Sequence, residues 1–133
     1  MYTIKRWRKS CPKMHYKLFV YGTLKQGYCN HHYLQNAIFL GNATTLYPYP
    51  MIAPKKIYSY LIDIPGKGKR VQGELYEVDL RTLKQVDRLE EVPRYYFRAK
   101  IEVKDEQGNV HEAYTYFVTN PPPFSQRHCL EKF

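Results

Sequence analysis

The acidic residue with the strongest case for chemistry is Glu90. The sequence predicts a helix over 79–90 that begins at Asp79 as its N-cap and ends before Pro93, because the residue before a proline is disfavoured in helical geometry. At about 100° per residue, Glu90 lies within the apolar arc of this helix, whereas Glu91 lies outside it. A carboxylate held against apolar neighbours has a raised pKa, which suits a general acid and base at neutral pH.

Two alternatives to this interpretation stay open from the residues alone. The helix can fray before Pro93, which would leave Glu90 as a solvated terminal charge. Asp87 lies near the edge of the same apolar arc and is a second, weaker candidate.

A turn made of Tyr21, Gly22, Thr23 and Leu24 follows a β-prone run at residues 17–21. Gly22 lets the chain turn and lets a ligand approach the N–H groups that follow. Such a run of donors can bind a carboxylate or an oxyanion. Because the same pattern is typical of ordinary turns, it indicates a site only together with the acid at position 90.

The sequence gives little support for a metal-binding site or for a catalytic serine or cysteine nucleophile. Cys29, His31 and His32 lie close in sequence, but adjacent histidines on a helix diverge by about 100° and no second ligand pair has a zinc-like spacing. The glycine-rich basic segment 66–70 lacks the phosphate-loop arrangement and is typical of a hairpin turn. We therefore expect no metal site, and no serine or cysteine triad is evident.

The elements that must position these residues alternate between strands and short helices. The pattern predicts strands at 17–21 and 38–46, a hairpin of 58–64 with 71–78, a hairpin of 100–104 with 110–118, and helical turns at 30–36 capped by Asn30. We divide the chain into a basic arm (1–15), one domain (16–120) and a C-terminal tail (121–133). The fold class is α+β, with a small curved or barrel-like sheet.

Charge and cysteine content narrow the function classes. The net charge of +9 comes from the first half, because all Asp and Glu residues follow residue 62. A basic arm can contact nucleic acid or anionic lipid, but the near-neutral remainder argues against a dedicated nucleic-acid domain. Three cysteines form no even framework, which favours a reduced, cytoplasmic location. No apolar run approaches membrane-spanning length, and Met14 is an alternative start.

Several separate blocks, spread in order over residues 16–118, carry a more specific signal. They are Val20-Tyr-Gly-Thr-Leu-Lys-Gln-Gly27 with Asn30-His31, Tyr47-Pro-Tyr-Pro-Met51, Leu61-Ile-Asp-Ile-Pro-Gly-Lys-Gly68, Val71-Gln-Gly-Glu-Leu-Tyr-Glu-Val-Asp79, Val86-Asp-Arg-Leu-Glu-Glu-Val-Pro93 and Tyr96-x-Arg98. Together they resemble the γ-glutamyl cyclotransferase-like family. The basic arm before Met14 and the tail containing Cys129 have no clear counterpart in this resemblance.

The resemblance implies a small mixed β-barrel with a few flanking helices, in which the loop 21–24 binds a γ-glutamyl group. It also implies that Glu90 is the general acid and base, in agreement with the helical wheel. Tyr96 and Tyr116 match positions of pocket tyrosines, with structural packing as the alternative. A small γ-glutamyl substrate is implied, with no metal and no organic cofactor, and we expect a monomer.

The implied reaction is an intramolecular cyclisation. The α-amine of an L-γ-glutamyl amine, such as γ-glutamyl-ε-lysine, attacks its own γ-carbonyl carbon, giving 5-oxo-L-proline and the free amine. One carboxylate with a raised pKa can take a proton from the attacking nitrogen and return one to the leaving nitrogen. Activity on γ-glutamyl amino acids and a non-catalytic role in binding a ligand or RNA are the alternatives.

Overall fold

The computed structural model describes residues 15–133. Nearly all of the predicted basic arm, with Met14, therefore lies outside the described residues. The strands in chain order are β2 (His15–Val20), β3 (Ile38–Thr45), β4 (Met51–Ile52), β5 (Tyr60–Leu61), β6 (Gln72–Asp79), β7 (Tyr96–Asp105) and β8 (Val110–Val118). The helices are α1 (Leu80–Leu89) and the short 3₁₀ helices η2 (His31–Leu34), η3 (Pro54–Lys56) and η4 (Gln126–His128).

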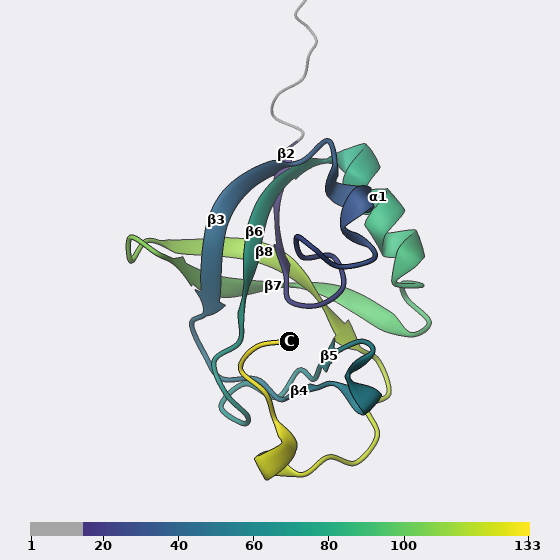
Figure 1. Cartoon of the computed structure of the whole chain (residues 1–133), viewed down its shortest axis with the longest axis vertical. Helices are drawn as coiled ribbons and strands as arrows, with labels where there is room; N and C mark the ends of the chain where they lie inside the picture. Colours follow the sequence, from purple (N-terminus) through teal and green to yellow (C-terminus); the bar gives the residue numbers. More distant parts are fainter. Residues whose placement is uncertain (1–14) are drawn as a thin grey trace, which may run out of the picture.

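Five of the strands form a closed barrel in the order β2-β6-β3-β7-β8 (Figure 1). The neighbouring pairs are antiparallel except for β2 and β8, which pair in parallel at Leu18 and Tyr114 and so close the barrel. The predicted α+β class and the small mixed barrel are thus confirmed. The hairpin of β7 and β8 is also confirmed, since Tyr96 pairs with Val118 at one end and Lys104 with Val110 at the other.

The predicted hairpin between residues 58–64 and 71–78 is wrong. Strand β5 pairs with β4, through Met51 with Leu61, and β6 pairs with β2 and β3 instead. The glycine-rich segment between β5 and β6 turns back against the chain before β4, where Tyr49 and Lys69 form an isolated bridge. A Cβ at Gly68 would lie 2.3 Å from the Tyr49 carbonyl oxygen, so this close approach requires glycine. The Gly/Pro cluster therefore serves backbone packing, not a hairpin turn.

Helix α1 lies against the outside of the barrel (Figure 1). Asp79 is its N-cap, as predicted, and Oδ1 accepts a 2.8 Å hydrogen bond from the Thr82 amide. Leu83 and Val86 are buried against strand residues that include Leu18. The helix ends at Leu89, one residue earlier than predicted, and Glu90 is its C-cap.

The segment 30–36 forms only the 3₁₀ helix η2, and the Asn30 side chain does not cap it. The Asn30 Nδ2 group donates a 3.0 Å hydrogen bond to the Thr23 hydroxyl oxygen. Asn30 thus occupies the predicted N-cap position, but its side chain does not cap the helix, because the nearby loop 21–24 offers it an acceptor.

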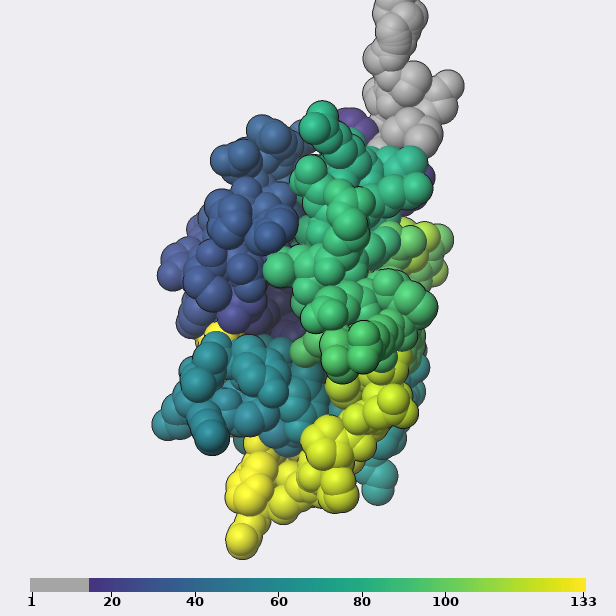
Figure 2. All heavy atoms as spheres, turned by 90° about the vertical axis from the view of Figure 1, so that its right-hand side faces the viewer, coloured from purple at the N-terminus to yellow at the C-terminus, as the bar shows by residue number. Residues whose placement is uncertain are grey.

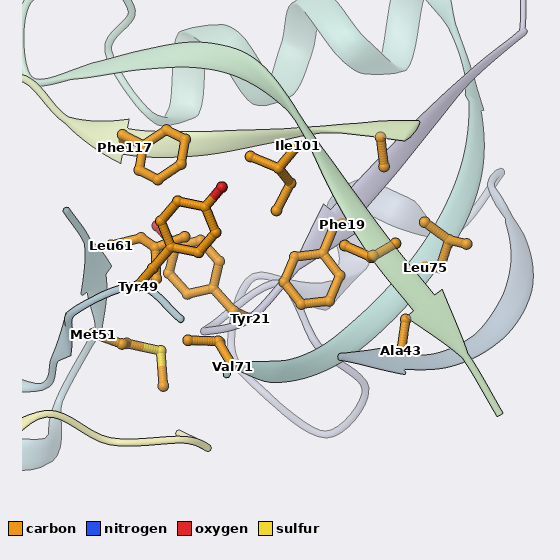
Figure 3. Packing of buried hydrophobic residues seen from close by; sticks show 12 residues of the cluster. Phe19, Tyr21, Ala43, Tyr49, Met51, Leu61, Val71, Leu75, Ile101 and Phe117 are labelled. Atoms are coloured by element: carbon orange, nitrogen blue, oxygen red, sulfur yellow. The ribbon is translucent and has the colours of Figure 1, made fainter. Parts of the chain in front are cut away.

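Alternation along β2 separates two apolar clusters. Phe19 points into the barrel with Leu75 and Phe117, as Figure 3 shows, while Leu18 and Val20 pack outward beneath α1 and η2. Tyr21, one residue beyond β2, is buried in the inner cluster (Figure 3). Because the strand is fixed in the barrel, the loop 21–24 that follows it has a fixed position at the end of the barrel.

The C-terminal segment returns to the barrel. Cys129 is buried, and Phe133 packs on the inner cluster. The Leu130 amide donates to the Met51 carbonyl oxygen at 2.9 Å. The Lys25 ammonium, although buried, donates to the Phe133 carbonyl oxygen at 2.7 Å. None of the helices in residues 15–133 is long and apolar enough to cross a membrane.

Candidate active site

A cavity of about 270 Å³ opens where three segments meet: the loop after β2, the C-terminal end of α1 and the chain from η3 into β5. Figure 2 shows the recess between the purple-blue segment, the green end of α1 and the teal segment. Its volume lies near the lower end of the range for small-molecule sites, which suits a ligand the size of one amino acid. Its lining residues are Phe19, Val20, Tyr21, Gly22, Thr23, Leu24, Cys29, Asn30, Ile57, Tyr58, Ser59, Leu89, Glu90, Tyr96 and Tyr116.

Glu90 lies in the wall of this cavity, at the end of α1. Its amide donates to the Val86 carbonyl oxygen at 2.9 Å, so the helix fixes the backbone while the residue as a whole is partly buried. Burial raises the pKa of the carboxyl group to about 7. Within residues 15–133 the carboxylate makes no hydrogen bond and no ion pair. Glu91, by contrast, is exposed.

The loop after β2 lies in the same cavity and carries unpaired donors. Within the described residues, the amides of Gly22, Thr23 and Leu24 donate to no protein acceptor. The loop is nevertheless held on its other side, because Asn30 contacts Thr23 and the Leu24 carbonyl oxygen lies 3.0 Å from Nδ1 of His31. A rigid loop with free N–H groups is preorganised for an anion.

Three tyrosines that line the cavity belong to different strands or loops. Burial raises the pKa of Tyr21, Tyr96 and Tyr116, and the negative charge of Glu90 adds to the rise in each case. All three hydroxyls therefore stay protonated at neutral pH. The Tyr21 hydroxyl donates to the Tyr116 carbonyl oxygen at 2.7 Å, which ties the end of β2 to β8.

Asp87, the second acidic candidate, has a different environment. Its Oδ1 accepts a 2.6 Å hydrogen bond from the Tyr116 hydroxyl, and its Oδ2 pairs with Arg98 at 2.9 Å. Asp87 does not line the cavity. Since both oxygens are engaged with protein groups, the side chain holds Tyr116 in place and is poorly suited to accept a proton from a ligand.

The structure adds cavity residues that sequence reasoning missed. Ile57, Tyr58 and Ser59 form the wall that leads into β5. No pattern in the sequence marks them, because their place depends on the pairing of β5 with β4. Asn30 is also in the wall, and its contact with Thr23 replaces the capping role that was predicted.

The Cys29-Asn-His31-His32 segment shows no metal-site geometry. Cys29 is exposed at the cavity wall, and Nδ1 of His32 lies 3.1 Å from its carbonyl oxygen. Among residues 15–133, no group of three His, Cys, Asp or Glu side chains could hold a metal ion. The lining of the Glu90 cavity also includes no lysine and no arginine. An anionic ligand there would be held by neutral donors.

A second and larger cavity, of about 330 Å³, lies over β3, β6 and β7 and does not include Glu90. Its wall combines lysines with carboxylates, among them Lys104 and Asp105. The Asp105 carboxylate is already hydrogen-bonded to His111 and to the amides of Gln107 and Asn109. Of these two cavities in residues 15–133, the smaller one combines the unengaged carboxylate with the free amides.

Comparison with known proteins places this barrel and cavity in a family. A family model described as "Gamma-glutamyl cyclotransferase, AIG2-like" matches residues 18–132. Gamma-glutamylaminecyclotransferase A of Danio rerio is 40% identical over 129 residues, covering 86% of this chain and 80% of its own. Gamma-glutamylaminecyclotransferase of Bos taurus is 42% identical over 114 residues, covering 80% and 67%.

The fold leads to the same family. The crystal structure of an AIG2-like protein from Mus musculus superposes with a TM-score of 0.80 at 30% identity, over 90% of this chain and 88% of that one. The family model, the two relatives and this structure all agree with the resemblance of the sequence blocks. The chain belongs to the γ-glutamyl cyclotransferase, AIG2-like family.

Proposed function

We propose that this protein is a γ-glutamylamine cyclotransferase, which converts an L-γ-glutamyl amine such as γ-glutamyl-ε-lysine into 5-oxo-L-proline and the free amine. The observation that carries the proposal is the position of Glu90. Its unpaired carboxyl group, with a pKa raised to about 7, shares a small cavity with the free amides of the loop after β2. The similarity to relatives named for this activity gives independent support.

The chemistry needs one group that both accepts and donates protons. The α-amine of the substrate is protonated at neutral pH and must lose a proton before it can attack the γ-carbonyl carbon. Glu90 takes that proton, the new C–N bond closes the five-membered ring, and the C–N bond to the leaving amine breaks. Protonated Glu90 supplies this proton to the leaving nitrogen. The ring nitrogen loses a second proton to solvent as the lactam forms, and the released amine takes up one proton from solvent to become an ammonium ion.

The remaining cavity residues bind and orient the substrate. We assign the amides of Gly22, Thr23 and Leu24 to the anionic end of the γ-glutamyl unit, because the cavity wall includes no basic side chain. Tyr96 and Tyr116 shape the walls, and Tyr21 anchors the loop through its hydrogen bond to β8. Holding the curled substrate brings nucleophile and carbonyl together without a covalent intermediate.

The direct test measures 5-oxoproline released from γ-glutamyl-ε-lysine by purified protein. We expect turnover by the wild type and none above background with Glu90→Gln, which keeps the shape of the side chain but cannot carry the proton. Glu91→Gln is the matched control, because Glu91 is the exposed neighbour and should retain wild-type activity. Full activity of Glu90→Gln would remove Glu90 from this role.

A panel of γ-glutamyl amines and γ-glutamyl amino acids, scored by the amine released, tests the substrate class. We expect γ-glutamyl amines to be preferred, and a preference for γ-glutamyl amino acids would instead identify the protein as a cyclotransferase for those compounds. Absence of turnover on the whole panel would favour a non-catalytic ligand-binding relative.

As part of the same proposal, the chain acts as a monomer in the cytoplasm. The free thiols of Cys29 and Cys129 fit a reducing compartment.

A further inference from the structure

Ser59 has an unusual environment for a buried hydroxyl. Only 8% of the residue is exposed, and within residues 15–133 its Oγ is the one buried side-chain nitrogen or oxygen atom without a hydrogen-bond partner. A buried polar atom that is left unpaired is destabilising by about 1–3 kcal/mol. Such atoms are rare in folded proteins and call for an explanation.

Ser59 borders the cavity that contains Glu90. Its hydroxyl lies directly alongside the loop after β2, since a Cβ added at Gly22 would be 2.7 Å from the Ser59 Oγ atom. Gly22 is thus the residue that makes room for this hydroxyl. Ser59 and the loop residues Gly22, Thr23 and Leu24 are therefore neighbours that line the same cavity, and neither the Ser59 hydroxyl nor the three loop amides have a protein acceptor within residues 15–133.

The substrate of the proposed reaction has one permanent negative charge, the α-carboxylate of its γ-glutamyl unit. A carboxylate has about four acceptor sites, so it can accept from the loop amides and from a hydroxyl at the same time. Because the cavity wall includes no lysine and no arginine, neutral donors must replace the water that this carboxylate loses on binding.

We propose that Ser59 is a substrate-binding residue whose hydroxyl donates a hydrogen bond to the α-carboxylate of the γ-glutamyl unit, beside the amides of the Gly22 loop. This inference rests on the proposed function. The hydroxyl has no partner within the protein because, in this proposal, its acceptor is the substrate. The Ser59 hydroxyl, which serves binding in this proposal, lowers the stability of the ligand-free protein.

Ser59→Ala tests the proposal, because it removes the hydroxyl and keeps Cβ. Hydrogen bonds to charged groups contribute enough that their loss lowers affinity by about tenfold or more. We expect KM for γ-glutamyl-ε-lysine to rise by that factor with little change in kcat. The Tm of the ligand-free variant should be equal to or above that of the wild type, because an unpaired buried group has been removed.

The part of the substrate that Ser59 contacts can be tested without turnover. Binding of 5-oxo-L-proline and of 2-pyrrolidinone, which is the same ring without the carboxylate, is measured by calorimetry or NMR. The Kd of 5-oxo-L-proline should rise about tenfold in Ser59→Ala, with no change for 2-pyrrolidinone. Equal weakening of both ligands would overturn the assignment to the carboxylate.

Thr115→Val is the matched control variant. Thr115 is fully buried, but its hydroxyl is already paired with the Phe19 carbonyl oxygen at 3.0 Å. This change should lower Tm and leave KM unchanged, the reverse of the pattern expected for Ser59→Ala. The inference would be overturned if the wild type is active and Ser59→Ala shows an unchanged KM or a fall in kcat alone. The proposed function would then remain intact. A wild type that releases no 5-oxoproline would overturn both.

Discussion

The side chains of Asp87 and Tyr116 are joined by a 2.6 Å hydrogen bond in which the tyrosine hydroxyl donates to Oδ1. The other carboxylate oxygen of Asp87 pairs with Arg98. Two acidic residues at the end of one helix therefore differ in role. Asp87 is occupied with protein partners, whereas Glu90 faces the cavity with no partner among residues 15–133. The two environments support the proposal that Asp87 positions Tyr116 and that Glu90 carries the proton.

Asp87→Asn tests this separation. The amide can still accept from Tyr116 but loses the ion pair with Arg98, which is largely shielded from solvent. We expect a loss of about 1–2 kcal/mol in the free energy of unfolding, together with a rise in KM because Tyr116 lines the cavity. Turnover should persist, and the fall of kcat/KM at low pH should occur at the same pH as in the wild type. If Asp87→Asn abolished turnover and Glu90→Gln did not, the proton carrier would be Asp87.

The pH dependence of catalysis should report Glu90. The carboxyl group must be ionised to accept the first proton, and its pKa is raised to about 7 by burial. We expect kcat/KM to rise with pH through a single step near 7. The measurement is initial 5-oxoproline release across pH 5–9 in buffers of constant ionic strength. A nearly flat profile between pH 5 and 8, as expected for a carboxylate with the usual glutamate pKa of about 4.3, would place an unburied carboxylate in the reaction.

The same pKa shift predicts how Glu90 affects stability. A carboxyl group whose folded-state pKa is raised binds more protons in the folded state than in the unfolded state, so stability falls as pH rises from the unfolded value to about 7. Glu90→Gln avoids this effect. We expect the variant to be more stable than the wild type at pH 8, by at most about 3 kcal/mol, with the difference vanishing at pH 4.

Urea unfolding at the two pH values measures this difference. Glu91→Gln serves as the control, because the exposed neighbour should show no such divergence. Equal stability of Glu90→Gln and the wild type at pH 8 would show that the Glu90 carboxyl group is solvated.

The contact between Gly22 and Ser59 predicts coupling between two substitutions. In Gly22→Ala the new methyl group would lie 2.7 Å from Ser59 Oγ, whereas the next nearest atoms are 4.0 Å away. We expect Gly22→Ala to destabilise the wild type more than it destabilises Ser59→Ala, with a coupling of about 1 kcal/mol. Denaturant unfolding of the four proteins of the cycle measures it. Strict additivity would show that the two residues do not touch.

Several features of the fold follow from local sequence alone. The N-cap at Asp79, the helix that follows it and the hairpin of β7 and β8 depend on interactions within short segments. The helical wheel also separated Glu90 from Glu91, because Glu90 keeps helical φ and ψ as the C-cap of α1, whereas Glu91 lies beyond the helix and is exposed. Local propensity and hydrophobic pattern agree in these segments.

Other features depend on partners far away in the sequence. The pairing of β5 with β4 instead of β6, and the contact of Asn30 with Thr23, could not be predicted because each residue had more than one local option. The parallel pairing of β2 with β8 joins segments almost 100 residues apart. Local sequence patterns do not determine with which of several possible strands or side chains a segment pairs.

The sequence by itself determined the α+β class, the helix that carries Glu90, the glycine turn after the first strand and the family resemblance. Only the tertiary structure decided that the carboxyl group and the loop amides share one cavity, that Asp87 is engaged by Tyr116 and Arg98, and that Ser59 is buried without a partner. The physical reason is that burial and hydrogen-bond satisfaction are properties of the closed barrel. They arise when β2, α1 and the β5 segment meet.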